Sequence, residues 1–422
     1  MRIETQCVQA GYQPENGQPR ILPIYQSTTY KYDSAEHLGK LFDLSVPGHM
    51  YTRISNPTVE MVENKIAALE GGVGAMLTSS GQAANLLAVL NLASAGDNIV
   101  CSSAIYGGTI NLFAFTLKRL GIETRFFTPE ATDEEISALI DGRTRLLFGE
   151  TVANPALIVC DIERLANIAH AHNVPLVIDN TFPTPVLCRP IEFGCDIVVH
   201  STTKYMDGHA SVVGGCIVDS GNFDWERAGK YPELTEPDES YHGVVYTKSF
   251  GRAAYIGKAR AQLMRDFGCT PQPIAAFILN LGLESLAVRM ERHCQNAQAV
   301  AEYLEKHPKV SWVNFPGLAS SPQHALAQKY LPNGVCGVVS FGVRGGRAAA
   351  MKFMDSLRLA QIVVHVADAR TSVLHPASTT HRQLTDEQLV DAGISADLVR
   401  LSVGIENIED ILEDLAQAFD QI

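Results

Sequence analysis

The stretch Asp196-Ile-Val-Val-His-Ser-Thr-Thr-Lys-Tyr-Met-Asp-Gly-His209 joins a short apolar segment to a loop that carries several hydroxyls and one lysine. Its first residues have the length and β-branched content of a buried strand. Ligands of open parallel sheets bind beyond the carboxyl ends of the strands, so chemistry is expected in this loop. A desolvated lysine is nucleophilic toward an aldehyde, which makes Lys204 a candidate catalytic residue, although a surface lysine is the simpler alternative. Ser201 and Thr203 could donate hydrogen bonds to a phosphate.

Short apolar strands alternate with helices on both sides of this loop. Asn56 can cap a helix that begins at Pro57 and ends at Gly71-Gly72. Further strands are predicted at 74–78, 98–102, 146–149, 174–179 and 196–200, and further helices at 83–93, 112–120 and 162–172. This alternation is typical of an α/β fold whose mostly parallel sheet is covered on both faces.

Three regions of the chain differ in pattern. Residues 1–58 are rich in glycine and proline and predict an irregular arm, for which a neighbouring subunit is the natural packing partner. Residues 59–267 predict a large domain, in which the acidic and aromatic stretch 221–250 is an inserted loop. Residues 268–422 predict a smaller C-terminal α/β domain. Its expected elements are a long helix at 283–306, strands near 338–341 and 398–403, and a last helix from 408.

The composition is that of an ordinary globular protein of 422 residues with a net charge of -13. The spread acidic charge argues against nucleic acid or an anionic membrane as partner. No apolar run approaches the roughly 18 residues of a membrane span, and Met1 to Gly11 lacks a signal core, so we expect a cytoplasmic protein. The nine cysteines form no Cys-x-x-Cys pair. We expect them to be small buried residues in a reducing compartment, with no metal bound.

Two other loops follow predicted strands. Gly81 and Gln82 lie among small residues where backbone N–H groups could approach an anion at a helix N-terminus, although glycine there is usually only a turn. Asp179 ends an apolar strand, and a buried carboxylate needs a cationic partner such as a protonated pyridine nitrogen; a capping aspartate is the alternative. Together with the Lys204 loop, these features fit one ligand that has a phosphate, a pyridine and an aldehyde. Pyridoxal 5'-phosphate is such a cofactor, and it acts as an electron sink.

The stretch from Asp196 to His209 resembles the lysine signature of the pyridoxal-phosphate enzymes of cysteine and methionine metabolism, the cystathionine γ-synthase family. Ala210 departs from it, where serine, glycine or asparagine is commoner. The likeness extends from Gln26-Ser-Thr-Thr-Tyr30 to Val399-Arg-Leu-Ser-Val-Gly-Ile-Glu406. It implies the fold-type I architecture, with Lys204 holding the cofactor as an imine and moving protons.

The resemblance also implies roles for other residues. Tyr51 and Arg53 would reach the phosphate of a neighbouring subunit, which implies an active homodimer that is usually paired into a tetramer. Gly81 and Gln82 would donate backbone N–H groups to the phosphate, and Tyr106 would stack on the pyridine ring. Asn154 would contact the ring hydroxyl, and Arg400 would bind the substrate carboxylate. Tyr106 or Tyr51 would assist Lys204 in catalysis.

Details of the chain resemble the O-acetylhomoserine sulfhydrylase branch of this family. Gly108 stands where methionine γ-lyases carry a cysteine. Tyr241-His-Gly243, and Asp368-Ala-Arg-Thr371 before His375-Pro-Ala-Ser-Thr-Thr-His381, look like that branch, with Arg370 as a second candidate for substrate binding. Ala367 departs from the pattern, where glycine is usual, and could reshape the carboxylate side of the pocket.

The expected reaction is γ-replacement on O-acetyl-L-homoserine by sulfide or a small thiol, giving homocysteine or methionine plus acetate. The alternative within the family is elimination, as in methionine γ-lyase or a cystathionine lyase. A cofactor-binding protein without catalysis is a remote alternative. It would predict the loss of Lys204, Asp179 or Arg400, and all three are present.

Overall fold

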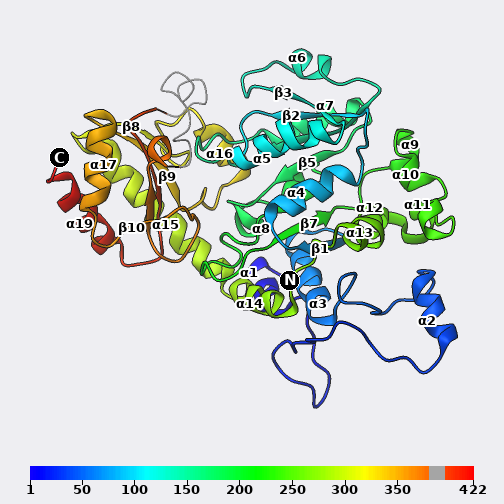
Figure 1. The fold of residues 1–422 in the computed structure, drawn as a ribbon. Helices are drawn as coiled ribbons and strands as arrows, with labels where there is room; N and C mark the ends of the chain where they lie inside the picture. The colour runs from blue at the N-terminus through cyan, green and yellow to red at the C-terminus, as the bar shows by residue number, and fades with distance from the viewer. Residues whose placement is uncertain (380–394) are drawn as a thin grey trace.

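A seven-stranded sheet forms the centre of the large domain in the computed structural model, which describes residues 1–379 and 395–422 (Figure 1). The strand order is β1-β7-β6-β5-β4-β2-β3, and only β7 runs antiparallel to its neighbours among these described strands. The strands are β1 Gly74–Thr78, β2 Asn98–Ser102, β3 Glu123–Phe127, β4 Thr144–Glu150, β5 Leu176–Asp179, β6 Ile197–His200 and β7 Gly215–Asp219. The predicted mostly parallel sheet is therefore confirmed.

Both faces of this sheet are covered. Alternate side chains of β5 enter two separate cores: Leu176 and Ile178 join one, and Val177 joins the other. The first core includes α3 (Pro57–Glu70) and α7 (Ile162–Ala171), and the second includes α4 (Gly81–Leu90). Outside the stretch 221–250, the other helices of this domain are α5 Gly107–Asn111, the π-helical turn η1 Leu112–Leu117, α6 Asp133–Ala138, α8 Thr184–Leu187, the 3-10 turns η2 Pro190–Phe193 and η4 Gly251–Ala253, α12 Ala254–Lys258, the π-helical turn η5 Ala259–Met264 and α13 Arg265–Phe267. A strand buried on both faces reads as a continuous apolar run, as the sequence of β5 does.

The N-terminal arm is more ordered than predicted. It contains α1 (Ile3–Gln9) and α2 (Ala35–Phe42), so the expectation of an irregular segment is wrong at these two places. Helix α1 packs on α3 and on the long helices that follow the large domain, with Cys7 fully buried, whereas α2 stands apart from the rest of the chain (Figure 1). Each helix has only one buried residue and is short, although α2 does carry Leu38, Leu41 and Phe42 at helical spacing after the capping Ser34, a signal that the prediction of an irregular arm overlooked.

The stretch 221–250 is also not the loop that was predicted. It contains the short helices α9 Trp225–Ala228, α10 Pro232–Thr235, η3 Glu239–Tyr241 and α11 Tyr246–Phe250. Trp225 packs edge-on against Tyr231 at 5.0 Å and stacks on Tyr255 at 5.7 Å between ring centroids. These aromatic contacts hold the helices on the large domain, and they depend on residues that are distant in the sequence.

The smaller domain has a five-stranded sheet of order β10-β11-β12-β9-β8 within the described residues. Its strands are β8 Val310–Asn314, β9 Val338–Val343, β10 Gln361–Ile362, β11 Ser372–Leu374 and β12 Leu398–Ser402. Its helices in the described residues are α14 Pro273–Glu284, α15 Leu286–Lys306, α16 His324–Tyr330, α17 Gly346–Ser356, the 3-10 turn η6 Pro376–Ser378 and α19 Ile408–Phe419. The predicted long helix, final helix and strands are thus confirmed, with α15 beginning after a break at Ser285. The predicted motif His375–His381 is described only as far as Thr379, so Thr380 and His381 lie outside the described residues.

No single helix in the described part of the chain is long and apolar enough to cross a membrane; α14 and α15 reach that composition only as a pair bent by 60°. The cysteines are unpaired in the structure, and all except Cys160 and Cys269 are buried.

Candidate active site

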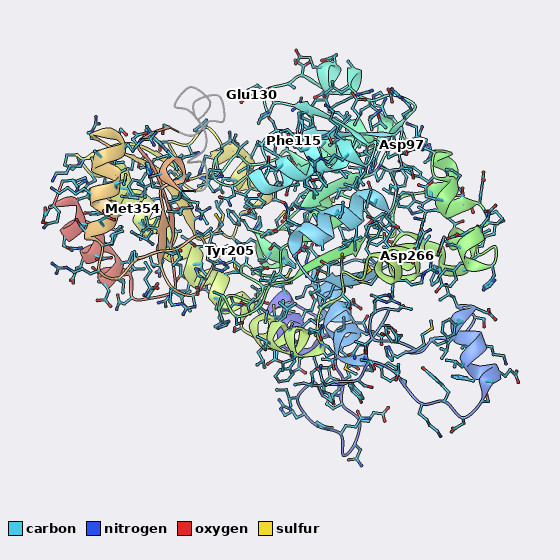
Figure 2. The ribbon with its side chains drawn as sticks, viewed as in Figure 1. Asp97, Phe115, Glu130, Tyr205, Asp266 and Met354 are labelled. Atoms are coloured by element: carbon cyan, nitrogen blue, oxygen red, sulfur yellow. The ribbon has the colours of Figure 1, made fainter. Side chains whose placement is uncertain are left out.

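Lys204 lies in the loop between β6 and β7, and this loop is anchored to the smaller domain. Tyr205 is fully buried where the two sheets approach each other (Figure 2), and its hydroxyl accepts a hydrogen bond from Gly337 N at 2.9 Å. The Arg289 guanidinium donates to Tyr205 O at 2.7 Å. Burial, together with the nearby charge of Arg400, lowers the pKa of Lys204 to about 8. An appreciable fraction of its amine is therefore uncharged near neutral pH, as a nucleophile requires.

Asp179 ends β5, next to the strand that leads to Lys204. Its Oδ1 accepts hydrogen bonds from Thr181 N at 3.0 Å and from Thr181 Oγ1 at 2.5 Å. Burial raises the pKa of Asp179, while these bonds and the charge of His200 act in the opposite direction. No lysine or arginine among the described residues forms an ion pair with this carboxylate. A protonated pyridine nitrogen would supply the missing cation, so Asp179 fits the expected cofactor.

The proposed phosphate corner brings the loops after β1 and β6 into contact. A Cβ on Gly81 would lie 2.6 Å from Ser201 Cβ, so only glycine allows this approach. The Thr203 hydroxyl donates to Gly214 O at 3.1 Å and accepts from Gly214 N at 3.0 Å. Because Thr203 already has partners within the chain, Ser201 is the hydroxyl of the predicted pair that is better placed to donate to a phosphate.

Gln82 and Tyr106 meet at Gly108. A Cβ on Gly108 would lie 2.5 Å from Tyr106 Cε1 and 3.1 Å from Gln82 Nε2. Tyr106 is the residue that precedes α5 and is 47% exposed, so its ring is accessible to a ligand. A cysteine at Gly108, as in the methionine γ-lyases, would require this ring to move.

Arg400 on β12 comes from the smaller domain and completes the site. Its Nη1 donates to Asn154 Oδ1 at 3.2 Å, and its Nη2 donates to His365 O at 3.4 Å. Its side chain is buried, and its Nε has no hydrogen-bond partner among the described residues. Burial lowers the pKa of Arg400 to about 10, which still leaves it a cation at neutral pH. A buried cation without a carboxylate partner fits a ligand that brings one.

The structure places the other predicted residues outside this cluster. Arg370 is exposed and forms an ion pair with Asp368 at 3.0 Å, and it also donates to His209 O at 3.0 Å. The Arg53 guanidinium lies 5.4 Å from the ring centroid of Tyr51, and both side chains are exposed. Within the described contacts of one chain, neither Tyr51 nor Arg53 reaches Lys204.

Two features of the site were missed in the sequence. Glu150 is the buried last residue of β4 and lies beside Asp179. A polar residue at the end of an apolar strand is the signal that identified Asp179, and the same signal could have identified Glu150. His200 Nε2 lies 2.6 Å from Glu70 Oε1, and both side chains are fully buried. Glu70 belongs to a distant helix, so no local signal could have predicted this pair.

Ala367 adopts a left-handed backbone conformation two residues after His365, whose carbonyl oxygen accepts a hydrogen bond from Arg400. Its φ is +68°, it is fully buried, and its N–H donates to Ser402 Oγ at 2.8 Å. An L-residue with a side chain pays about 1–2 kcal/mol in this region, whereas glycine does not. The departure noted in the sequence is therefore a site of backbone strain.

Replacing Ala367 with glycine is expected to cost about 1–2 kcal/mol less in free energy of unfolding than the same substitution at an unstrained position, because relief of the strain offsets the entropy that glycine adds to the unfolded chain. The measurement is the urea midpoint of the purified protein. Ala348→Gly, at an exposed position of α17, is the matched control and should lose about 1 kcal/mol. Equal destabilisation by both substitutions would contradict the strain at Ala367.

The amine of Lys204 and the unpaired carboxylate of Asp179 lie at the carboxyl edge of one sheet, which defines an enzyme of the pyridoxal-phosphate class. More narrowly, the chain belongs to the Cys/Met metabolism PLP-dependent enzyme family, whose model matches residues 4–420.

Known proteins resemble the chain over its whole length. The homocysteine synthase of Schizosaccharomyces pombe is 49% identical over 99% of this chain and 98% of its own. The O-acetyl-L-homoserine sulfhydrylase 1 of Thermus thermophilus is 47% identical over 99% of this chain and 100% of its own. A Campylobacter jejuni crystal structure, assigned as an O-acetylhomoserine (thiol)-lyase with N'-pyridoxyl-lysine-5'-monophosphate, superposes with a TM-score of 0.95 at 36% identity, covering 100% of both chains. The fold and the cofactor expected from the sequence are thus confirmed.

Proposed function

We propose that this chain catalyses γ-replacement on O-acetyl-L-homoserine by sulfide or a small thiol, giving homocysteine or methionine plus acetate. The observation that carries the proposal is that Lys204, after β6, and Arg400, on β12, lie near enough for the arginine charge to lower the pKa of the lysine amine. One group is suited to hold the cofactor and the other to hold an amino-acid carboxylate. The names of the most similar relatives favour replacement over elimination.

In this mechanism the bound cofactor supplies an electron sink for the charge that develops on the substrate. Asp179 holds the proton on the ring nitrogen. Arg400 binds the substrate carboxylate and so orients the α-proton toward Lys204. The Lys204 Nζ removes that proton and returns it at later steps, with Tyr106 as the expected assisting group. Because Arg400 is buried, water is largely excluded from this side of the site, which strengthens each of these charge interactions.

The test is a product assay with the purified protein. O-Acetyl-L-homoserine and sulfide should give equal amounts of acetate and homocysteine, and omission of sulfide should stop most of this turnover. Methionine alone and cystathionine alone are the discriminating substrates. Faster release of ammonia from either of them than of acetate from O-acetyl-L-homoserine would favour a lyase instead. Gly108 supports the replacement reading, because it lacks the cysteine of the methionine γ-lyases.

The proposal includes a homodimer as the active unit, paired into a tetramer in the cytoplasm, with no nucleic acid or membrane partner. The support is that Tyr51 and Arg53 are exposed and remote from Lys204 in their own chain. An exposed arginine next to an exposed aromatic ring is suited to contact a phosphate in a second copy of the chain.

Mixing inactive Arg53→Ala and inactive Lys204→Ala proteins is expected to restore about a quarter of the activity, because half of randomly mixed dimers are hybrids with one intact site each. The measurement is acetate release after subunit exchange has been verified by mass. Mixing Lys204→Ala with Asp179→Asn serves as the control. Both residues come from the same chain in each site, so no combination should recover activity. Absence of recovery in the first mixture would mean that Arg53 acts within its own subunit.

A further inference from the structure

Glu150 is buried at the centre of the site, and no role has been given to it so far. It is the last residue of β4, and the register of the parallel pair places it directly opposite Asp179 on β5. Partner residues in neighbouring strands point to the same face of a sheet. The carboxyl groups of Glu150 and Asp179 therefore lie side by side beneath the proposed cofactor.

The Glu150 side chain holds the two loops that carry the other ligand-facing residues. Its Oε2 accepts a hydrogen bond from Tyr106 N at 2.6 Å, and its carboxyl group also accepts one from the Asn154 N–H. Asn154 in turn accepts from Arg400 Nη1 at 3.2 Å. Through these bonds one carboxyl group links the aromatic ring, the arginine partner and the strand of Asp179.

We propose that Glu150 is a positioning residue that works as an uncharged carboxylic acid, fixing Tyr106 and Asn154 while leaving Asp179 as the single negative charge available to the pyridine nitrogen. This inference rests on the proposed cofactor site. It assigns the proton of the carboxyl pair to Glu150 and the charge to Asp179.

The surroundings of the pair support this division. Burial and then the charge of Asp179 raise the pKa of Glu150 well above its usual range. The two backbone N–H groups of Tyr106 and Asn154 act in the opposite direction, with no cation of the described residues among these opposing influences. Asp179 has two hydrogen bonds from Thr181, and the charge of His200 also favours its ionised form. Among the described residues, the thiols of Cys101 and Cys160 also lie near Glu150, and burial raises the pKa of both, so both are neutral. Two like charges this close in a dry site cannot both persist, and Asp179 is the better stabilised of the two.

The test compares Glu150→Gln with Glu150→Ala in the cofactor-loaded enzyme. Glutamine resembles a protonated glutamate, since its carbonyl oxygen can still accept the Tyr106 N–H. Glu150→Gln should therefore keep kcat within a few-fold of wild type. Glu150→Ala frees both loops, and a displacement of about 1 Å should lower kcat by about 100-fold while cofactor content is retained. An equal loss in both variants would show that the ionised carboxylate is needed.

A second readout is the pH at which the visible absorption of the cofactor bound at Lys204 changes. A nearby negative charge stabilises a cation and raises the pH of its titration. If Glu150 is uncharged, Glu150→Gln leaves this midpoint where it is. A clear fall in the midpoint would mean that Glu150 is ionised and would overturn the proposal.

Glu63 provides a matched control. It is a buried glutamate that accepts a backbone N–H, from Leu77 at 2.8 Å, but it is paired with Arg260 outside the site. Glu63→Ala should lower the unfolding midpoint and leave the absorption midpoint unchanged. A shift of the absorption midpoint in Glu63→Ala would show that this midpoint reports general loosening of the fold and not the charge at residue 150. Loss of the visible band in the wild-type protein itself would count against the cofactor site and not against Glu150 alone.

Discussion

Lys204→Ala protein is expected to lose at least about 10²–10⁴-fold in kcat, because this is the usual contribution of a positioned group that transfers protons. Loss of covalent attachment to the cofactor adds to that. The variant should still hold some cofactor through the phosphate corner near Gly81 and Ser201. The measurements are acetate release from O-acetyl-L-homoserine and cofactor content of the desalted protein.

Borohydride treatment identifies the lysine directly. In the wild-type protein, reduction should fix the cofactor on the peptide that contains Lys204, and Lys204→Ala should yield no labelled peptide. Lys118 and Lys248 are exposed, and their alanine variants should behave as wild type. Labelled cofactor on either of those lysines would overturn the assignment of Lys204.

Arg400→Ala and Arg400→Lys are expected to lose about 30-fold to several thousand-fold in kcat/KM, which corresponds to roughly 2–5 kcal/mol for a hydrogen-bonded charge pair in a partly desolvated site. Lysine is no substitute, because it offers a point charge without the planar fork that holds both carboxylate oxygens. Both variants should keep the cofactor and its colour. The loss should be equal for O-acetyl-L-homoserine and for any slowly accepted amino acid, since the carboxylate is common to both.

Arg370→Ala is the control for the binding of the substrate carboxylate by Arg400. The ion pair with Asp368 and the exposure of its side chain argue that Arg370 is not the principal carboxylate ligand, so we expect a small change. If Arg400→Ala kept a near wild-type kcat/KM and Arg370→Ala lost most of it, Arg370 and not Arg400 would be the residue that binds the substrate carboxylate.

The sequence was sufficient for the parts of the fold and site that depend on local pattern. Asp179 and Lys204 were identified because each directly follows a run of apolar residues, and parallel strands bring their carboxyl ends to one edge. Strand β3 was missed, since it lies at the edge of the sheet and its residues Glu123, Thr124 and Arg125 give it no apolar run. The helices in 221–250 were missed for a different reason: their burial comes from contacts such as Trp225 with Tyr255.

The contacts within the site that join distant parts of the chain could not be predicted from local pattern either. The proximity of Arg400 to Asn154 joins two domains across 246 positions of sequence, and only the resemblance to a family suggested it. The link from Glu150 to Tyr106 crosses 44 positions. Neither distance can be read from periodicity, because both depend on how the loops pack after the sheet has formed.

The place of β7 in the sheet has a consequence for the order of assembly during synthesis. Gly74 at the start of β1 pairs with Asp219 at the end of β7, and β7 is the strand that separates β1 from β6. A nascent chain that ends before residue 215 therefore leaves β1 and β6 as open edges, which are templates for aggregation. The loops of Gly81 and Ser201 cannot be held together until β7 is inserted. The cofactor would then bind only the finished sheet, and by mass action it would stabilise the folded state of completed chains while giving no such stabilisation to shorter ones.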